Sequence, residues 1–377
     1  MKLELTLEER AARTEFRAFA AEHVVPHADR WDREQAVPRE VIDRLAAEGL
    51  LGSNIPSDYG GVGRDMLTYG LLTEEIGRGC SSLRSLLTVH DMVAHAVERW
   101  GSREHKERYL PRLAKGEILG ALALSEPNAG SDAKSVETVA ASAGDAWVLT
   151  GTKKWTTFGQ IAGLFLVLAQ HEGKPTAFLV EREAPGLSIR PLSGLHGTRA
   201  SLLAEITLDG CRIPKDQLLG RVGFGVSHVV AAALEHGRYS VAWGAVGVAQ
   251  ACLDASLTYA RSRKQFGSLL FDHQLVRAML ADMITNVRAA RLLCLRAGHL
   301  RQTGDPGAFM EVMVAKYFAA NTAAKAANDA VQIHGANGCS EDYPVARFLR
   351  DSKVFEIIEG STQIQQITIP LFDFQEL

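Results

Sequence analysis

The spacing of apolar residues changes twice along this 377-residue chain, and no other feature limits its possible folds as strongly. From Thr6 to about Gly116 apolar residues recur every three or four positions, which is typical of amphipathic helices. From about Leu119 to Val222 they form short runs rich in Val, Ile, Leu, Thr and Phe, which favours an antiparallel β-sandwich or barrel. After Phe224 the helical spacing returns. We therefore expect an N-terminal helical domain over 1–118, a central β domain over 119–223 and a C-terminal four-helix bundle over 224–377.

Local patterns support the two helical regions. Thr6 and Glu9 match a capping box at the start of the first helical run, and Pro38 stands where the first turn of another helix would begin. The last region contains three alanine-rich stretches, each able to form a long helix, at 229–263, 273–300 and 309–335. Their apolar stripes suit a bundle whose helices pack against each other and against other subunits.

Composition excludes several classes of protein. Hydrophobic residues make up 46% and charged residues 23% of the chain, which describes a soluble globular protein. The net charge of −3 gives no reason to expect nucleic acid, and no stretch approaches the roughly 18 apolar residues of a membrane span. The first residues lack the apolar core of a signal peptide, and five cysteines lie far apart without metal-type spacing. We expect a cytoplasmic protein with no metal, nucleic-acid partner or membrane partner.

Two segments of the β region combine turn residues, hydroxyls and an indole. LALSEPNAGSD places Ser125 and Ser131 in a turn that leaves a strand, where hydroxyls and N–H groups can hold a polar ring edge. An ordinary β-turn explains the same residues equally well. In GTKKWTTFG, Trp155 and Thr157 fall on one face of a strand and Thr156 on the other. The indole could pack on a flat cofactor, or it could be half-buried in a sandwich core.

A third segment, ARSRKQFG, gathers cations where a predicted helix ends. Arg263 either interacts favourably with the helix dipole or clamps a phosphate with its planar guanidinium. The sequence contains no Rossmann glycine motif after a strand, no P-loop and no Cys–His metal spacing. Phosphate binding here therefore remains one of two interpretations of Arg263.

A fourth segment, FEIIEGSTQIQQ, places Glu359 after two isoleucines and directly before a glycine. A carboxylate held against apolar neighbours loses solvation, so its pKa rises and it becomes a better proton acceptor near neutral pH. The alternative is a surface or salt-bridged glutamate beside a turn. The segment thus offers one candidate for a general base.

Taken together, these segments resemble the flavin-dependent acyl-CoA dehydrogenases. The matching motifs are LSEPNAGSD, GTKKWTTFG, YARSRKQFG, HQLVRAMLADM, VQIHGANGCSEDYPVARFLRD and IIEGSTQIQ, which follow the family's order over about 240 residues. The helical–β–helical order extends the resemblance to the whole chain. It implies a homotetramer in which each subunit binds one FAD and oxidises an acyl thioester.

The resemblance also implies which residues contact the flavin. They comprise contacts along the ring in the β domain, contacts with the pyrophosphate and adenine ends, a contact donated by a neighbouring subunit, and an adenosine-side contact after the base. The hydroxyl of Thr157 is expected to approach flavin N5, and Ala336 replaces a glycine that is common in the family. In this order the set is Leu122, Leu124, Ser125, Ser131, Trp155, Thr156 and Thr157; Arg263, Gln265, Phe266 and His273; Gln332, Gly335 and Ala336; Ser361 and Gln363.

Glu359 stands where the family carries its catalytic base, which removes the α-proton of the thioester while the β-hydrogen passes to the flavin as hydride. Some members carry the base on an earlier helix, where this chain has Gly237, which cannot accept a proton. By the same resemblance, Gly360 allows close backbone approach and Arg238 organises the substrate end of the pocket. Glu235 falls where the family contacts the pantetheine arm.

The stretch SSLRSLLTVHD bears on the acyl group. Arg84 and Thr88 are one helical turn apart and share a face. They match positions at which glutaryl-CoA dehydrogenases hold the distal carboxylate of their substrate. Alternatively, Arg84 pairs with an acidic residue of the first domain. The first interpretation implies a short acyl group with a polar or anionic end.

Two departures from the family concern the carrier of the acyl group. Only HEGK joins two strands where many relatives have a longer loop, and Val139 stands where an arginine or lysine is frequent. Fewer phosphate contacts would suit a phosphopantetheine arm on an acyl carrier protein rather than free CoA. CSSLRS, AWGAVG, FDHQLV and EIIEGS also resemble the acyl-carrier-protein dehydrogenases that make hydroxymalonyl extender units for polyketides.

The expected function is an FAD-dependent dehydrogenase of short acyl thioesters, carried on an acyl carrier protein or on CoA. One alternative is a glutaryl-type or short-chain acyl-CoA dehydrogenase of catabolism. Another is a non-catalytic flavoprotein or thioester-binding partner, but an intact Glu359 with complete flavin motifs favours an enzyme. Electron-transfer flavoprotein and oxygen both remain possible electron acceptors.

Overall fold

The computed structural model describes residues 4–373 and confirms the helical–β–helical order. The first region consists of helices, and Thr6 caps the first of them through the predicted capping box with Glu9. Pro38 is the N-cap of the third helix, one residue before the position that the sequence predicted. The six helices are α1 (Leu7–His23), α2 (Ala28–Glu34), α3 (Arg39–Ala47), α4 (Met66–Gly79), α5 (Ser81–Trp100) and α6 (Arg103–Ala114).

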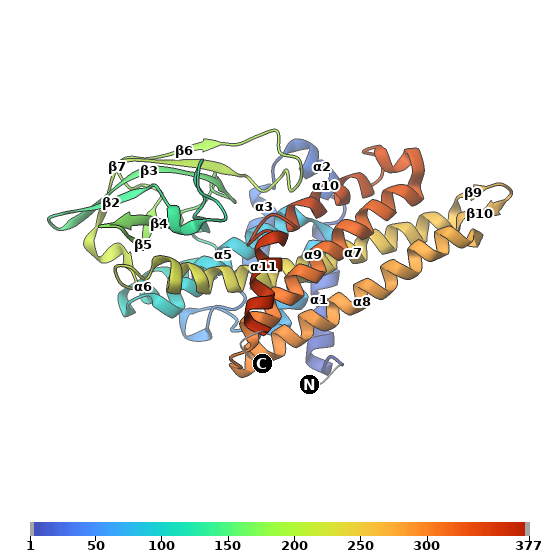
Figure 1. The fold of residues 1–377 in the computed structure, drawn as a ribbon, viewed down its shortest axis with the longest axis horizontal. Helices are drawn as coiled ribbons and strands as arrows, with labels where there is room; N and C mark the ends of the chain where they lie inside the picture. Colours follow the sequence, from blue (N-terminus) through green and yellow to red (C-terminus); the bar gives the residue numbers. More distant parts are fainter. Residues whose placement is uncertain (1–3, 374–377) are drawn as a thin grey trace.

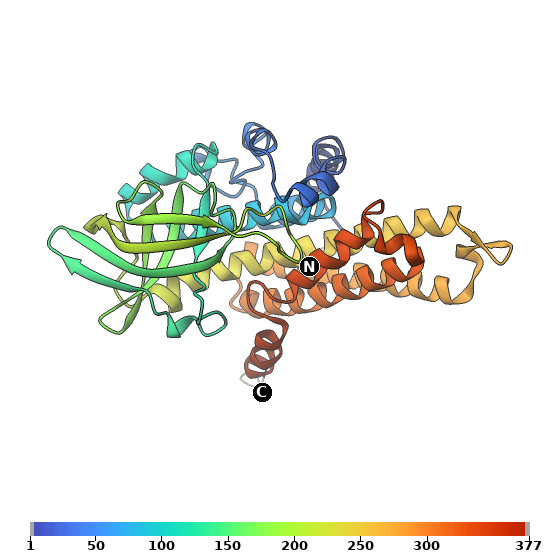
Figure 2. The same cartoon turned by 90° about the horizontal axis from the view of Figure 1, so that it is seen from above.

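The middle region is a curved sheet at one end of the molecule (Figures 1 and 2). Its strand order is β6-β7-β3-β2-β4-β5-β8, and β1 pairs with β4. Most neighbours are antiparallel, but β4 is parallel to both β1 and β2, so the sheet is mixed. The strands are β1 (Gly120–Ala123), β2 (Val139–Ala143), β3 (Ala146–Thr156), β4 (Leu164–His171), β5 (Lys174–Glu181), β6 (Leu187–Pro191), β7 (Ala204–Pro214) and β8 (Leu218–Leu219).

The expectation of a purely antiparallel sheet was therefore wrong in this detail. Parallel neighbours need a long connection, and the β2–β3 hairpin together with its loops supplies one between β1 and β4. Short apolar runs reveal that strands exist, but they do not reveal which strands pair.

The last region contains the three predicted long helices and two shorter ones. A π-helical turn at Gly225–Val230 leads into α7, and a two-stranded tip joins α7 to α8 at the end of the molecule opposite the sheet (Figure 1). The elements are α7 (Ala231–Ser262), β9 (Lys264–Gln265), β10 (Ser268–Leu269), α8 (Gln274–Thr303), α9 (Ala308–His334), α10 (Val345–Phe355) and α11 (Thr362–Asp373). The boundaries 118/119 and 223/224 stay predictions.

Helix α7 is the centre of the helical part, because it packs against α4, α5, α8 and α9. Its buried residues are mostly alanine, glycine and valine, which lets four neighbouring helices approach closely. No helix in the described range 4–373 is long and apolar enough to cross a membrane. Within the same range, no cluster of three His, Cys, Asp or Glu side chains could hold a metal ion.

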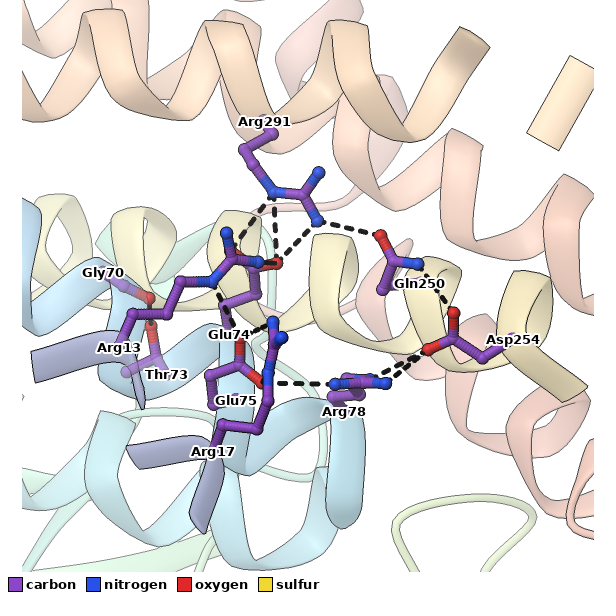
Figure 3. A network of polar contacts seen from close by, with 10 residues as sticks. All are labelled: Arg13, Arg17, Gly70, Thr73, Glu74, Glu75, Arg78, Gln250, Asp254 and Arg291. Carbon is purple, nitrogen blue, oxygen red and sulfur yellow. Dashed lines mark hydrogen bonds and ion pairs between the residues drawn. The ribbon is translucent and has the colours of Figure 1, made fainter. Parts of the chain in front are cut away.

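A network of ion pairs joins the first helix, α1, to α4, and α4 to α8 (Figure 3). Glu74 and Glu75 of α4 are fully buried, and Arg13 of α1 contacts a carboxylate oxygen of each at 2.9 and 2.8 Å. Arg291 of α8 lies 2.6 Å from Glu74, and Arg17 lies 2.8 Å from Glu75. Buried carboxylates are costly unless they are paired, so each glutamate depends on its arginines.

Candidate active site

Glu359 lies in the short connection between α10 and α11, against the central helix α7. Its backbone is left-handed with φ 55°, a conformation that costs a non-glycine residue about 1–2 kcal/mol. Its Oε2 atom is buried and has no hydrogen-bond partner within the described chain. Burial raises the pKa of Glu359 to about 7, although three nearby cations oppose the shift. The raised pKa agrees with the apolar sequence around this residue.

Gly237 of α7 faces the Glu359 carboxylate. A Cβ atom at this glycine would lie 2.8 Å from Oε2 of Glu359 and 2.6 Å from Sδ of Met92, both closer than van der Waals contact allows. Because Gly237 has no side chain, the carboxylate of Glu359 fits at this position. A base on α7 and a base at Glu359 would occupy the same volume.

Two cations hold the backbone of this connection. Arg238 of α7 donates from Nε to the carbonyl oxygen of Glu359 at 2.9 Å. Lys316 of α9 donates from Nζ to the carbonyl oxygen of Gly360 at 2.8 Å. Gly360 needs its own positive φ of 89°, whereas a Cβ there would meet only ordinary contacts within the chain. Sequence reasoning included Arg238 but missed Lys316, whose only visible mark is a cation within an alanine-rich run.

Arg84 of α5 is fully buried and has no carboxylate within 4.0 Å among the described residues. Its guanidinium donates to Thr88 at 2.9 Å and to Ser85 at 3.2 Å, and Nε has no partner. Thr88 in turn lies 2.7 Å from the hydroxyl of Ser240 on α7. The alternative interpretation, an ion pair with an acidic residue of the first domain, is therefore wrong for the described chain.

Arg84 and Glu359 influence each other electrostatically. Burial lowers the pKa of Arg84 to about 10, so the guanidinium stays charged at neutral pH. The negative charge of Glu359 acts to raise that pKa, and the positive charge of Arg84 acts to lower the pKa of Glu359. A buried cation without a counter-ion and a carboxylate whose buried Oε2 atom has no hydrogen bond thus lie in one part of the helical bundle.

The loop after β1 is held by a buried ion pair that sequence reasoning also missed. Lys153 of β3 lies 2.5 Å from Oε1 of Glu126, and both side chains are buried. Glu126 further accepts hydrogen bonds from the Thr138 N–H and hydroxyl. This pair fixes the loop containing Ser125 and Ser131 to the sheet. Lys153 had appeared in the sequence as one of two adjacent lysines, with nothing to mark it as buried.

Trp155 and Thr156 end strand β3 in an irregular conformation. Trp155 has φ 64° at a register shift between β3 and β7, so regular alternation does not extend to Thr157, which lies beyond the strand. Trp155 is nevertheless 52% exposed and lies outside the hydrophobic core cluster of the sheet, which argues against the alternative of a half-buried core residue. Thr156 is buried and its hydroxyl has no partner within the described chain. An exposed indole beside an unpaired hydroxyl fits a flat ring with a polar edge.

The remaining predicted flavin contacts lie away from the sheet. Phe266, at the tip between α7 and α8, is 97% exposed, and the whole tip stands at the far end of the molecule (Figure 1). The end of α9 lies near it, since Asn337 donates to the Tyr259 hydroxyl at 2.9 Å. One chain therefore does not bring together Arg263, Gln265, Phe266, His273, Gln332, Gly335 and Ala336 with Leu122, Leu124, Ser125, Ser131, Trp155, Thr156 and Thr157.

Three further predicted residues lie near Glu359 or along α7. Ser361 and Gln363 follow the Glu359–Gly360 turn at the start of α11. Glu235 is partly exposed, and its carboxylate lies 3.5 Å from Nε of Arg301. A pantetheine contact at Glu235 would therefore compete with this ion pair, and it stays a prediction.

Known proteins match this chain over almost its whole length. Models of the acyl-CoA dehydrogenase N-terminal, middle and C-terminal domains match residues 6–117, 121–211 and 225–370. A glutaryl-CoA dehydrogenase of Desulfococcus multivorans is 38% identical over 98% of this chain and 97% of its own length. A structure of a glutaryl-CoA dehydrogenase in complex with glutaryl-CoA is 36% identical, with a TM-score of 0.95, and covers 100% of this chain and 97% of that chain. The structure of FkbI, a protein for biosynthesis of a methoxymalonyl polyketide extender unit, is 33% identical, with a TM-score of 0.88, and covers 96% of this chain and 99% of that chain.

Proposed function

This chain belongs to the acyl-CoA dehydrogenase family, and from that premise we propose that Glu359 is the base for a short acyl thioester whose far end binds to Arg84. The protein is an oxidoreductase that acts on the CH–CH bond of acyl thioesters, with FAD as its cofactor. Bound FAD supplies the acceptor for the hydride that leaves the β-carbon. The exposed Trp155 and the unpaired Thr156 hydroxyl support its placement against the end of β3.

Glu359 can accept the α-proton because its Oε2 atom is buried and unpaired. As the Cα–H bond breaks, the proton forms an O–H bond on the carboxylate, the thioester carbonyl stabilises the developing negative charge, and the electron pair forms the Cα=Cβ bond as the β-hydrogen leaves as hydride. A pKa of about 7, raised mainly by burial, makes Glu359 a stronger base than an exposed glutamate. Gly237 leaves the space in which the carboxylate sits.

One observation supports the nature of the acyl group: the buried guanidinium of Arg84 has no carboxylate within 4.0 Å in the described chain. A buried charge without a counter-ion costs several kcal/mol. A carboxylate or other polar group at the end of the substrate would offset that cost through charge-assisted hydrogen bonds. Thr88 and Ser240 continue the polar surface beside the guanidinium.

Arg84→Met tests this assignment, since it keeps much of the volume and removes the charge. Anaerobic flavin reduction by a glutaryl thioester should slow by roughly a hundredfold, which corresponds to about 2–3 kcal/mol. Reduction by a butyryl thioester should change little. Equal losses with both substrates would show that Arg84 serves the fold and would remove the case for an anionic acyl end.

Glu359→Gln tests the base separately. The amide has the same shape as the protonated acid, so FAD content should match the parent and the melting temperature should match it at acidic pH, while flavin reduction falls on the order of a hundredfold or more. Near-normal reduction would place the base elsewhere. The parent's own reduction by a thioester tests the alternative of a non-catalytic flavoprotein, which would show none.

An acyl carrier protein is the second candidate for the carrier, and the β4–β5 turn favours it. His171 pairs with Lys174, so only two residues connect strands β4 and β5. Nearby, the position at which many relatives have an arginine or lysine is occupied by Val139, which is 52% exposed. The likeness to FkbI, whose context is biosynthesis of a methoxymalonyl extender unit, makes a hydroxymalonyl-type pathway one candidate context. The test presents one acyl group on CoA and on a carrier protein. Admitting oxygen or an electron-transfer flavoprotein afterwards identifies the acceptor.

A further inference from the structure

Lys316 is a buried cation that the proposed reaction does not use. It lies on α9 with an exposed fraction of 0%, and the carbonyl oxygen of Gly360 is the partner of its ammonium. No carboxylate in the described part of the chain lies within 4.0 Å of it. Its helix neighbours Ala315 and Ala319 are apolar and fully buried. An apolar side chain would avoid the desolvation cost at this place, so the cation needs another reason.

The contact of Lys316 completes a clamp on the turn that carries the base. Arg238 from α7 binds the carbonyl of Glu359, and Lys316 from α9 binds the carbonyl of the next residue, Gly360. Both residues of the turn have positive φ, which is strained for Glu359. Two donors from two helices therefore over-determine a backbone that would otherwise relax, and with it the direction of the carboxylate.

The charges around Glu359 give Lys316 a second effect. Arg238 on α7, Lys316 on α9 and Arg84 on α5 all act to lower the pKa of Glu359. Glu356, on the connection itself, acts on Lys316, and Glu235 of α7 acts on Arg238.

Substrate binding would change the charge around Arg84, Arg238 and Lys316 in different ways. A substrate carboxylate bound at Arg84 would neutralise that cation and add a negative charge. By the family resemblance, Arg238 organises the substrate end of the pocket. Lys316 contacts backbone only, so its charge would persist through substrate binding.

We propose that Lys316 is a positioning residue for the base: it fixes the Glu359–Gly360 turn and keeps the Glu359 carboxylate ionised while an anionic substrate occupies Arg84. The proposal rests on the proposed role of Glu359 as the base. Burial lowers the pKa of Lys316 to about 8 and the charge of Glu359 opposes this, so the ammonium is still charged at neutral pH.

The test compares Lys316→Met, Lys316→Arg and Lys325→Met in the FAD-loaded enzyme. Lys325 lies on the same helix, but it is half exposed and pairs with Asp282 and Asp329. The measurement is the rate of anaerobic flavin reduction by butyryl-CoA and by glutaryl-CoA across the neutral pH range. The parent rate should rise as Glu359 loses its proton.

In Lys316→Met this rise should move to higher pH, so the rate near neutral pH falls about tenfold for each pH unit of displacement and recovers in alkali. The displacement should be larger with glutaryl-CoA than with butyryl-CoA. Lys316→Arg should keep most of the parent profile, and Lys325→Met should keep all of it. A uniform loss of rate at every pH, with the rise unmoved, would overturn the proposal and leave Lys316 a structural residue.

Thermal melting gives a readout that does not depend on turnover. Because the pKa of folded Glu359 lies above that of the unfolded chain, its protonation stabilises the fold at low pH, and that stability is lost as pH rises through about 7. The melting-temperature difference between E359Q and the parent should follow this loss, and Lys316→Met should move it to higher pH. If E359Q reduces flavin normally, the proposed function fails. If E359Q is inactive but neither profile moves in Lys316→Met, only this inference fails.

Discussion

Replacing Gly237 by alanine should disable the base while leaving most of the fold intact. The new Cβ would lie 2.8 Å from Oε2 of Glu359, and ordinary contact begins near 3.4 Å, so the carboxylate must move by 0.6 Å. A displacement of about 1 Å at a reacting group costs roughly a hundredfold in rate, so 0.6 Å corresponds to a loss of roughly fifteenfold. Overpacking costs about 1–3 kcal/mol, and the helix propensity of alanine returns about 1 kcal/mol.

Gly237→Ala should therefore lower the rate of flavin reduction roughly fifteenfold while lowering the free energy of unfolding by only about 0–2 kcal/mol. The assay is stopped-flow reduction at saturating butyryl-CoA, with FAD content and a chemical melt measured on the same preparation. The new Cβ also approaches Sδ of Met92 at 2.6 Å, and the double variant Gly237→Ala, Met92→Ala removes that second clash. A rate that stays low in the double variant assigns the loss to the carboxylate. A single variant within about twofold of the parent rate would refute the argument that Gly237 provides the space for the base.

The purified protein should be yellow, with about one FAD per chain, and should form a homotetramer by light scattering, since one chain separates its predicted flavin contacts (Figure 1). Phe266→Ser, at a side chain that is 97% exposed, should weaken FAD retention and assembly without lowering the stability of the single chain. Glu74→Gln should destabilise the fold by about 3–5 kcal/mol in chemical denaturation, because Arg291 loses its buried carboxylate partner and Arg13 keeps only Glu75, whereas Glu107→Gln at an exposed pair should cost under about 1 kcal/mol.

The order of the three regions and the ends of several helices could be predicted, because spacing and capping are local properties of the sequence. Thr6 and the long alanine-rich helices are examples. The pairing of β1 with β4 could not be predicted, since it depends on contacts between segments about forty residues apart. The left-handed backbone of Trp155 also lay beyond local patterns, because tertiary packing selected a conformation that tryptophan rarely adopts.

The same distinction between local sequence and tertiary contacts applies to the residues of the candidate site. Glu359 stood out because its apolar neighbours and the following glycine are adjacent in sequence. Whether Arg84 met an acidic residue could be decided only in three dimensions, where its α5 neighbours proved to be hydroxyls. Lys316 and Lys153 were missed because a single lysine in a helical run, or a lysine beside another lysine, usually faces solvent. Their burial follows from how α9 meets the Glu359 turn and how β3 meets the loop after β1.

The position of the base links three residues that look independent in the sequence. A carboxylate on a helix would have its direction set by the helix, but Glu359 lies on a left-handed turn, whose backbone must be held by other groups. Arg238 and Lys316 hold it through two successive carbonyls, and Gly237 leaves the volume that the side chain needs. The same cations limit how far burial raises the pKa of Glu359. Strain in the turn, two buried cations and a helix glycine are thus connected consequences of placing the proposed proton acceptor at this point of the chain.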